Sequence, residues 1–146
     1  MEKNNDALFF TCSLIEYISR ATRNRRKDVI KSLGKDLQQI YCYADVFHCE
    51  PIEKVADDFT QRNNIPAGNY DNISNCKYTV PDYWDIGEVF ARLIEDCYEE
   101  KDIFKGIKEV YDSWLTDKIL NFNSDLYYQS RDYLAACYKE GELLTA

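Results

Sequence analysis

The sequence contains little glycine, proline or histidine, and it lacks the short motifs that mark many enzymes. Among 146 residues there are five glycines, three prolines and one histidine. The glycines are isolated and form neither the G-x-x-x-x-G-K-S/T loop nor the G-x-G-x-x-G turn that bind phosphate groups. We therefore expect no nucleotide cofactor. The scarcity of turn formers also argues against a linker-rich or low-complexity chain.

Long apolar runs and a recognisable export signal are also missing. No stretch approaches the roughly 20 consecutive apolar residues that a membrane-spanning helix requires. The opening residues, MEKNNDALFF, contain too short an apolar run for the core of a signal peptide. We expect a cytoplasmic protein that does not enter a membrane and whose thiols are reduced.

The cysteines follow none of the spacings typical of metal or redox sites. None forms a C-x-x-C pair, and a zinc site would have a single histidine to draw on. We therefore expect no metal ion, and we expect most of the thiols to be small buried hydrophobes. The six positions are Cys12, Cys42, Cys49, Cys76, Cys97 and Cys137.

The sequence offers no convincing catalytic constellation. His48 stands beside Cys49, but neighbouring residues on a helix or strand point in different directions and are poor dyad partners. We expect His48 to be packed at a helix junction with its ring nitrogens satisfied. Paired carboxylates such as Asp57 and Asp58 are expected to form solvated helix faces. No residue is assigned a catalytic role, and an enzyme that uses Cys49, Cys42 or a carboxylate is the least favoured alternative.

Helical periodicity, by contrast, extends over most of the chain. Apolar residues recur every three or four positions, for example at Leu8 and Cys12, which is the pattern of an amphipathic helix. This predicts an all-α protein, and we expect a compact bundle of six to eight helices in a single domain, residues 1–146. One of these helices is expected to run over residues 103–122.

A long central loop is expected to separate two groups of helices. The loop is indicated by a cluster of turn formers that includes Pro66, Gly68 and Asn69. Its last residues, 76–80, have a short strand pair as an alternative conformation. In sequence order the expected parts are the helical group 5–62, the loop 63–80 and the helical group 81–141.

The distribution of charge is the most uneven feature of the sequence. The net charge is −8, yet the residues from Arg20 to Lys35 contain seven lysines and arginines against one acid, Asp28. This basic island therefore carries +6 and the rest of the chain −14. Such asymmetry points to partners that are selected partly by electrostatic field.

The basic island has two interpretations. It supplies four candidate partner contacts, Arg23, Arg25, Arg26 and Lys27. In the first interpretation they neutralise nucleic-acid phosphates, but residues 28–33, Asp-Val-Ile-Lys-Ser-Leu, lack the Asn and Gln side chains that read bases. In the second they pair with carboxylates, on an acidic protein surface or within the protein itself. We favour the second, and a nucleic-acid-binding regulator that uses residues 20–35 is the alternative.

Aromatic residues are abundant, and 12 of them are tyrosines. Tyrosine and tryptophan lead the hot spots of protein interfaces. We therefore predict a partner-contacting patch in and after the central loop, and the alternative is that these side chains hold the loop against the core. The four residues are Tyr70, Tyr78, Tyr83 and Trp84.

A family resemblance rests on mainly hydrophobic positions between residues 8 and 59. They are Phe9-Phe10-Thr11-Cys12, Ile15-Glu16, Val29, Leu33, Ile40, Tyr43 and Val46-Phe47-His48. In these positions the N-terminal third resembles a family of short bacterial proteins of unknown function, which are often encoded beside ADP-ribosyltransferase-like toxin domains. The chain departs from it at Cys49-Glu50-Pro51, where relatives carry a small polar, glycine-containing turn, and in its long C-terminal half. The resemblance implies a bacterial accessory or antitoxin-like role and supplies no catalytic residue.

These features together predict a non-enzymatic bacterial protein that binds another protein. In its most specific form the prediction is an antitoxin, immunity or anti-defence protein that occludes its partner. The product of a neighbouring gene is the first candidate for that partner. The sequence favours no particular oligomeric state.

Overall fold

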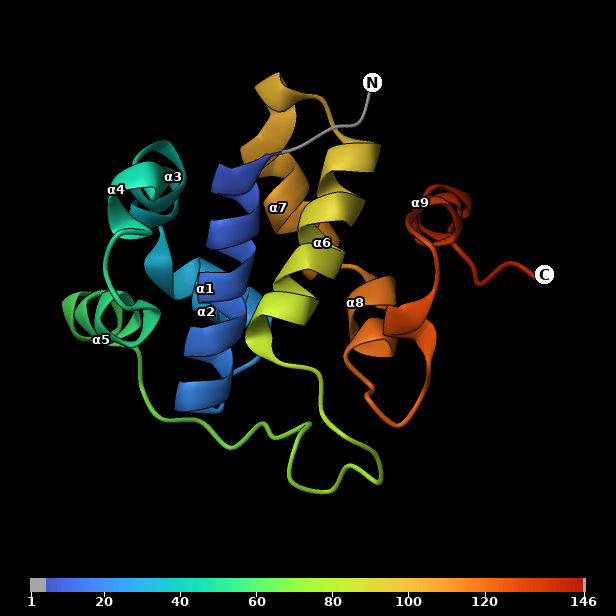
Figure 1. Ribbon diagram of the computed structural model, residues 1–146, viewed down its shortest axis with the longest axis horizontal. Coiled ribbons are helices and arrows are strands. Elements are labelled where there is room, and N and C mark those ends of the chain that lie inside the picture. Colours follow the sequence, from blue (N-terminus) through green and yellow to red (C-terminus); the bar gives the residue numbers. More distant parts are fainter. Residues whose placement is uncertain (1–4, 146) are drawn as a thin grey trace.

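A computed structural model describes residues 5–145 and confirms the all-α class (Figure 1). Within these residues, nine α-helices and two short 3-10 helices follow one another and no strand is present. None of these helices is long and apolar enough to cross a membrane. The α-helices are α1 (Asp6–Thr22), α2 (Arg26–Leu33), α3 (Asp36–Cys42), α4 (Ala44–Phe47), α5 (Ile52–Arg62), α6 (Tyr83–Cys97), α7 (Ile103–Tyr111), α8 (Trp114–Ile119) and α9 (Arg131–Glu140). The 3-10 helices are η1 (Glu100–Asp102) and η2 (Leu126–Tyr128).

Helices α1 and α6 pack against each other at the centre of the molecule (Figure 1). Helix α1 begins after Asn5, whose side chain accepts a hydrogen bond of 2.9 Å from the amide of Leu8 and so caps the helix. Where the two helices cross, a Cβ atom on Gly87 would lie 2.7 Å from the Cα of Ser13. Only glycine therefore allows the helices to approach this closely.

One hydrophobic core runs through both helical groups. It includes Leu14 and Ile18 from α1, Phe90 from α6 and Leu115 from α8, all fully buried. Helices α3, α4 and α5 lie on one side of α1, and α9 lies on the far side of α6 (Figure 1). The N-terminal and C-terminal groups thus stabilise each other through shared apolar burial.

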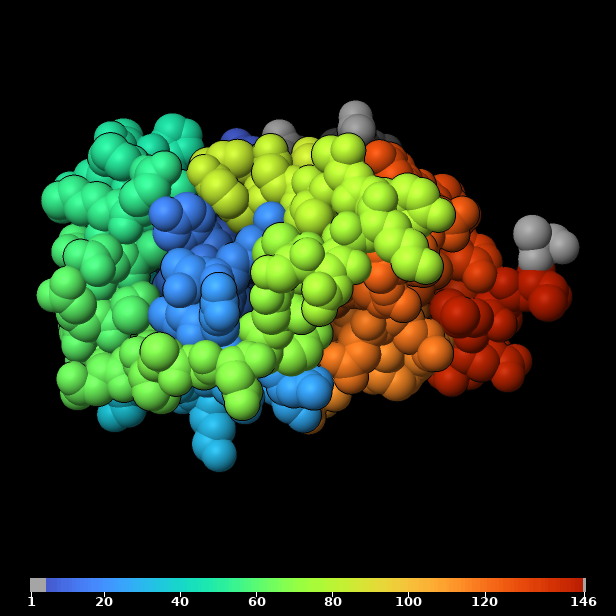
Figure 2. Space-filling view, turned by 90° about the horizontal axis from the view of Figure 1, so that it is seen from below, coloured from blue at the N-terminus to red at the C-terminus, as the bar shows by residue number. Residues whose placement is uncertain are grey.

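The central loop between α5 and α6 lies across the lower face of the molecule (Figures 1 and 2). It covers residues 63–82, none of which forms a helix or a strand, so the alternative of a strand pair is not realised. Hydrogen bonds hold it to the helices beneath. The amide of Gly68 donates to the carbonyl of Thr22 over 2.8 Å, and the amide of Lys77 donates to the side chain of Asn123 over 2.8 Å.

The single helix expected over residues 103–122 is wrong, because the chain breaks between α7 and α8. At the break Ser113 adopts an extended backbone, with φ −82° and ψ 160°. The carbonyl of Val110 accepts hydrogen bonds from the hydroxyls of Ser113 and Thr116, over 2.6 and 2.5 Å. Hydroxyl groups that occupy a nearby carbonyl compete with the hydrogen-bond ladder of the helix. Splits of this kind are why the described residues hold nine α-helices, several of them short.

Candidate functional site

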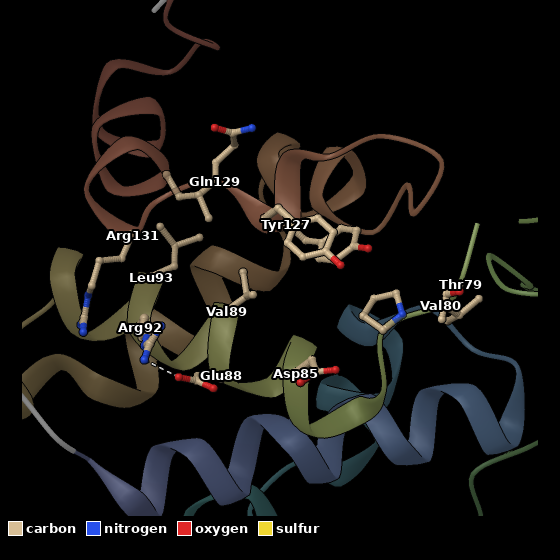
Figure 3. Close-up of a pocket in the computed structure, with 13 residues that line it drawn as sticks. Thr79, Val80, Asp85, Glu88, Val89, Arg92, Leu93, Tyr127, Gln129 and Arg131 are labelled. Carbon is tan, nitrogen blue, oxygen red and sulfur yellow. Dashed lines mark ion pairs between the residues drawn. The ribbon is translucent and has the colours of Figure 1, made fainter. Parts of the chain in front are cut away.

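A groove of about 490 Å³ lies between α6 and the chain that leads into α9 (Figure 3). Helix α6 forms one side of it. Helix η2 and the first turn of α9 form the other side, and the last loop residues, 79–81, close one end. Two segments that are far apart in the sequence, residues 79–93 and residues 127–134, therefore meet at this site.

The hydrophobic periodicity of α6 decides which of its side chains face the groove. Ile86, Phe90 and Ile94 occupy one face of the helix and are fully buried in the core. Asp85 and Val89 lie on an adjacent side of the helix and line the groove (Figure 3). The alternation follows from the 3.6-residue turn of the helix.

Apolar and aromatic side chains make up the middle of the groove. Val89 and Leu93 come from α6, and Leu134 comes from α9. The opposite wall is Tyr127 and Tyr128, whose ring centroids are 4.4 Å apart. Tyr128 is 77% exposed, which makes it the most exposed large hydrophobic residue of the described chain. The wall therefore presents aromatic surface to any occupant of the groove.

Asp85 stands at the loop end of the groove without a cationic partner. It belongs to a capping box at the start of α6. The Asp85 amide donates to the Asp82 side chain over 2.7 Å, and the Asp82 amide donates to the Asp85 side chain over 3.2 Å. Within residues 5–145, no lysine, arginine or histidine forms an ion pair with either carboxylate. Desolvation, the Tyr128 hydroxyl and the charge of Asp85 together raise the pKa of Tyr127. Asp85 is thus an uncompensated negative charge close to the aromatic wall.

The other end of the groove is occupied by paired charges. Arg131 holds Asp96 with two hydrogen bonds, of 2.9 Å from Nε and 2.8 Å from Nη2, and reaches Glu95 over 3.3 Å. The hydrogen bonds to Asp96 are the main reason that the pKa of Arg131 is raised. Arg92 pairs with Glu88 one turn away on α6 (Figure 3). The groove is therefore polar at both ends, with its free negative charge at the Asp85 end.

No protein-family model, curated protein or solved structure matches this chain. The function has to be argued from the chemistry of the molecule, and the resemblance of the N-terminal third to a toxin-associated family stays a prediction. In the part of the chain that the structure describes, no group of three or more His, Cys, Asp or Glu side chains is placed to hold a metal ion. The lining of the groove includes no histidine, cysteine or serine among residues 5–145.

The expected packing of His48 is wrong, because this residue is exposed at the end of α4. Its neighbour Cys49 is exposed as well. The expectation that most thiols are buried is also wrong: all six lie within the described residues and none is in a disulfide, but only Cys12 and Cys137 are buried. Burial raises the pKa of the Cys12 thiol to about 12, which keeps it protonated and unreactive at neutral pH.

Part of the basic island gathers on the surface at the start of α2. The guanidinium carbon of Arg25 lies 4.8 Å from the centroid of the Tyr70 ring, and Arg25 Nη1 lies 3.7 Å from the carboxylate of Asp117. Lys27 Nζ lies 3.8 Å from the carboxylate of Asp112. The structure therefore brings together three of the predicted partner contacts, Arg25, Lys27 and Tyr70. The two cations already lie close to carboxylates of the same chain, Asp117 and Asp112.

Arg26 as a partner contact is wrong, since the residue is 2% exposed. Its Nε and Nη2 atoms donate to the two carboxylate oxygens of Glu16 over 2.9 and 2.5 Å, and Arg20 Nε donates to the same carboxylate over 2.8 Å. Burial alone would raise the pKa of Glu16, but the charges and hydrogen bonds of Arg26 and Arg20 lower it overall. Arg26 therefore pairs with a carboxylate of the protein itself, which is one form of the second interpretation of the basic island. Arg23, in contrast, is exposed, with a left-handed backbone (φ 58°) at the end of α1.

The other predicted aromatic contacts have separate surroundings. Tyr78 is 67% exposed and directly precedes the loop residues that line the groove. Tyr83 and Trp84 are half-buried in the first turn of α6, where their ring centroids lie 5.0 Å from Tyr17 and 5.5 Å from Phe9 of α1. Tyr78 can meet a partner freely, whereas Tyr83 and Trp84 pack mainly on α1. The four aromatic residues do not form one patch.

The sequence reasoning missed the residues that build the groove wall. Tyr127 and Tyr128 are not among the candidate contact residues that the sequence supplied. Neighbouring residues on a short helix point in different directions, so one of two adjacent tyrosines is expected at the surface. The sequence therefore contains a signal for one exposed tyrosine. It contains no signal that α6 lies opposite these two rings and forms the other side of the groove.

Proposed function

We propose that this protein works by binding another protein, and that the groove between α6 and α9 receives a segment of the partner. The observation that carries the proposal is the exposed tyrosine wall above an apolar floor, in a groove of about 490 Å³. Tyrosine anchors next to apolar pockets, surrounded by polar groups, are typical of interface hot spots. The activity is non-enzymatic in this proposal, and the partner is held and occluded.

The charge of the groove-forming half supports a basic partner. Residues 79–146 contain 15 acids and seven bases, which gives −8, so the preceding residues are neutral overall. Charge of one sign on this scale accelerates the association of a partner with the opposite sign. A basic protein, such as the product of a neighbouring gene, is the partner that this half suits. An antitoxin, immunity or anti-defence role is the most specific form of the proposal.

Nucleic-acid binding through the basic island is the second candidate, and one observation favours it. Lys27, Lys31 and Lys108 line an open hollow of about 520 Å³ between α2 and α7. Against it, Arg26 is buried and Lys27 is already close to Asp112. This candidate predicts that affinity for a DNA or RNA duplex falls steeply between about 50 and 200 mM salt and weakens in an Arg25→Ala/Lys31→Ala variant. If affinity for the duplex changes neither with salt nor in this variant, nucleic-acid binding through the basic island is excluded.

The leading proposal is tested by isolating the protein with its partner from the organism that encodes it. We expect one protein to be recovered in a stoichiometric complex, and Tyr128→Ala to weaken that complex by about tenfold or more. Tyr43→Ala is the matched control, because Tyr43 is 57% exposed and lies between α3 and α4, at the opposite end of the molecule (Figure 1). Recovery of no stoichiometric partner, or equal loss in both variants, would overturn the proposal.

A further inference from the structure

The basic island contains an internal example of how this protein holds an arginine. The guanidinium group of Arg25 lies against the ring of Tyr70, 4.8 Å from its centroid, and close to the carboxylate of Asp117. A planar cation is attracted to the face of an aromatic ring and to a carboxylate at the same time. The Arg25 side chain thus lies against one tyrosine ring and near one aspartate at the surface.

The groove offers the same two groups at its Asp85 end, with no cation of the described residues paired to the carboxylate. Tyr127 and Tyr128 supply two neighbouring aromatic rings tilted by 31°, and Asp85 supplies a carboxylate that no cation of the described residues pairs with. The carboxylate is near enough for its charge to contribute to the raised pKa of Tyr127. The cations that do line the groove, Arg92 and Arg131, are held by Glu88 and Asp96.

We propose that the Asp85 end of the groove binds an arginine side chain of the partner, with its guanidinium group against the tyrosine wall and paired with Asp85. This inference rests on the proposed function and names the chemistry that the groove recognises. The apolar stem of the arginine and its apolar neighbours lie over Val89 and Leu93. The partner segment is therefore basic and apolar, which agrees with the excess of acids in this half of the chain.

Arginine fits this end of the groove better than lysine. Its flat guanidinium group stacks on a ring and bonds a carboxylate through two N–H groups, whereas an ammonium group is more strongly hydrated and forms no such fork. The groove also shields the pair from water on the α6 side, and partial shielding strengthens both contacts. Neutral side chains of similar length, such as acetylated lysine or citrulline, have no charge and lose the attraction to the Asp85 carboxylate.

The experiment uses two tripeptides that differ in one charge, Ac-Leu-Arg-Leu-NH2 and its citrulline counterpart. Each is titrated into the full ¹⁵N-labelled chain, and amide shifts are followed by NMR. We expect saturable shifts at Asp85, Val89, Tyr127 and Tyr128 with the arginine peptide. The citrulline peptide, which has nearly the same shape but no charge, is expected to bind about fivefold more weakly.

Two variants separate the carboxylate of Asp85 from general charge. Asp85→Asn keeps an oxygen that accepts from the Asp82 amide, so α6 keeps its cap, and it is expected to reduce the affinity for the arginine peptide about fivefold. Asp82→Asn removes one negative charge from the same turn, where asparagine caps as well as aspartate, and it lies outside the groove lining. We expect Asp82→Asn to bind the arginine peptide as the unmodified chain does.

The outcomes distinguish this inference from the proposed function. Equal affinity for the two peptides, or no saturable shift in the groove, overturns the arginine site. If a natural partner is lost on Tyr128→Ala but retained on Asp85→Asn, the groove still binds proteins and the arginine site alone is wrong. If the arginine peptide binds as described but no partner is recovered, the site stands and the proposed function fails.

Discussion

Arg26 and Arg131 both hold a carboxylate through two hydrogen bonds, but their surroundings are opposite. The side chains of Arg26 and Glu16 are each 1% exposed, between α1 and α2. The side chains of Arg131 and Asp96 are 28% and 19% exposed, at the edge of the groove between α9 and α6. The first pair is therefore a part of the interior, and the second is a surface feature that water still reaches.

The difference teaches that burial, more than geometry, decides what an ion pair contributes. Removing one partner of a buried pair leaves a charge in a low dielectric, where water cannot replace the lost bonds. Removing one partner of a half-exposed pair lets water solvate the other. We therefore expect the Glu16–Arg26 pair to serve stability and the Arg131 pair to serve the shape and charge of the groove.

The largest effect is expected from Arg26→Met, which leaves Glu16 buried with Arg20 as its remaining partner. We expect the free energy of unfolding to fall by about 3 to 5 kcal/mol, measured by urea denaturation. Arg25→Met is the control, since Arg25 is half-exposed and its removal should cost less than about 1 kcal/mol. If Arg26→Met does not fold, adding Glu16→Gln removes the buried negative charge that has lost its main partner and should restore part of the stability. A loss below about 1 kcal/mol for Arg26→Met contradicts the comparison.

A second, smaller effect is expected from pH. The pKa of Glu16 lies below its ordinary value of 4.5, because Arg26 and Arg20 outweigh the effect of burial. The resulting stability is fully present above that ordinary value and is lost as the pH falls through the lower pKa of the folded protein. The stability advantage of the unmodified chain over Glu16→Gln should therefore stay constant above about pH 5 and shrink below it. Urea denaturation across this range tests the prediction, and an advantage that grows in acid would refute it.

Arg131→Met is expected to cost less than Arg26→Met. Asp96 and Glu95 stay in contact with water, so we expect a loss of about 1 to 2 kcal/mol in the free energy of unfolding. Arg131→Lys keeps the positive charge but loses the two-point hydrogen bond to Asp96. Its free energy of unfolding should therefore lie between those of the unmodified chain and Arg131→Met. A loss for Arg131→Met as large as that for Arg26→Met would show that exposure does not separate the two pairs.

The smallest effect is expected from Arg92→Met on the exposed side of α6. Arg92 is half-exposed and pairs with Glu88 one turn away, and methionine has a similar helix propensity. We expect a loss of about 0.3 to 0.5 kcal/mol by urea denaturation, as for other pairs with this spacing. A loss above 1 kcal/mol would mean that the Arg92–Glu88 pair stabilises the fold more than its exposure suggests.

Much of the fold could be predicted from local patterns. The helical periodicity at Leu8 and Cys12 predicted a helix where α1 lies, and the turn formers around Pro66 and Gly68 placed the long loop between α5 and α6. The break between α7 and α8 was missed because the apolar spacing continues across Ser113, whereas the hydroxyls of Ser113 and Thr116 bond to the Val110 carbonyl where the helix ends.

The site was far less predictable. The sequence showed seven basic residues in a short stretch, but not that Arg26 turns inward to Glu16 while Arg25 turns outward to Tyr70. The groove depends on residues 79–93 meeting residues 127–134, and no local pattern brings these two segments together.

What the sequence by itself determined is the all-α class, the position of the long loop and the uneven charge. Those properties depend on neighbours within a few residues, where periodicity and turn chemistry act. The tertiary structure alone decided which arginine is buried and where Tyr127, Tyr128 and Asp85 meet. The physical reason is that a charge or a ring takes its role from the groups packed around it, and those groups come from distant parts of the chain.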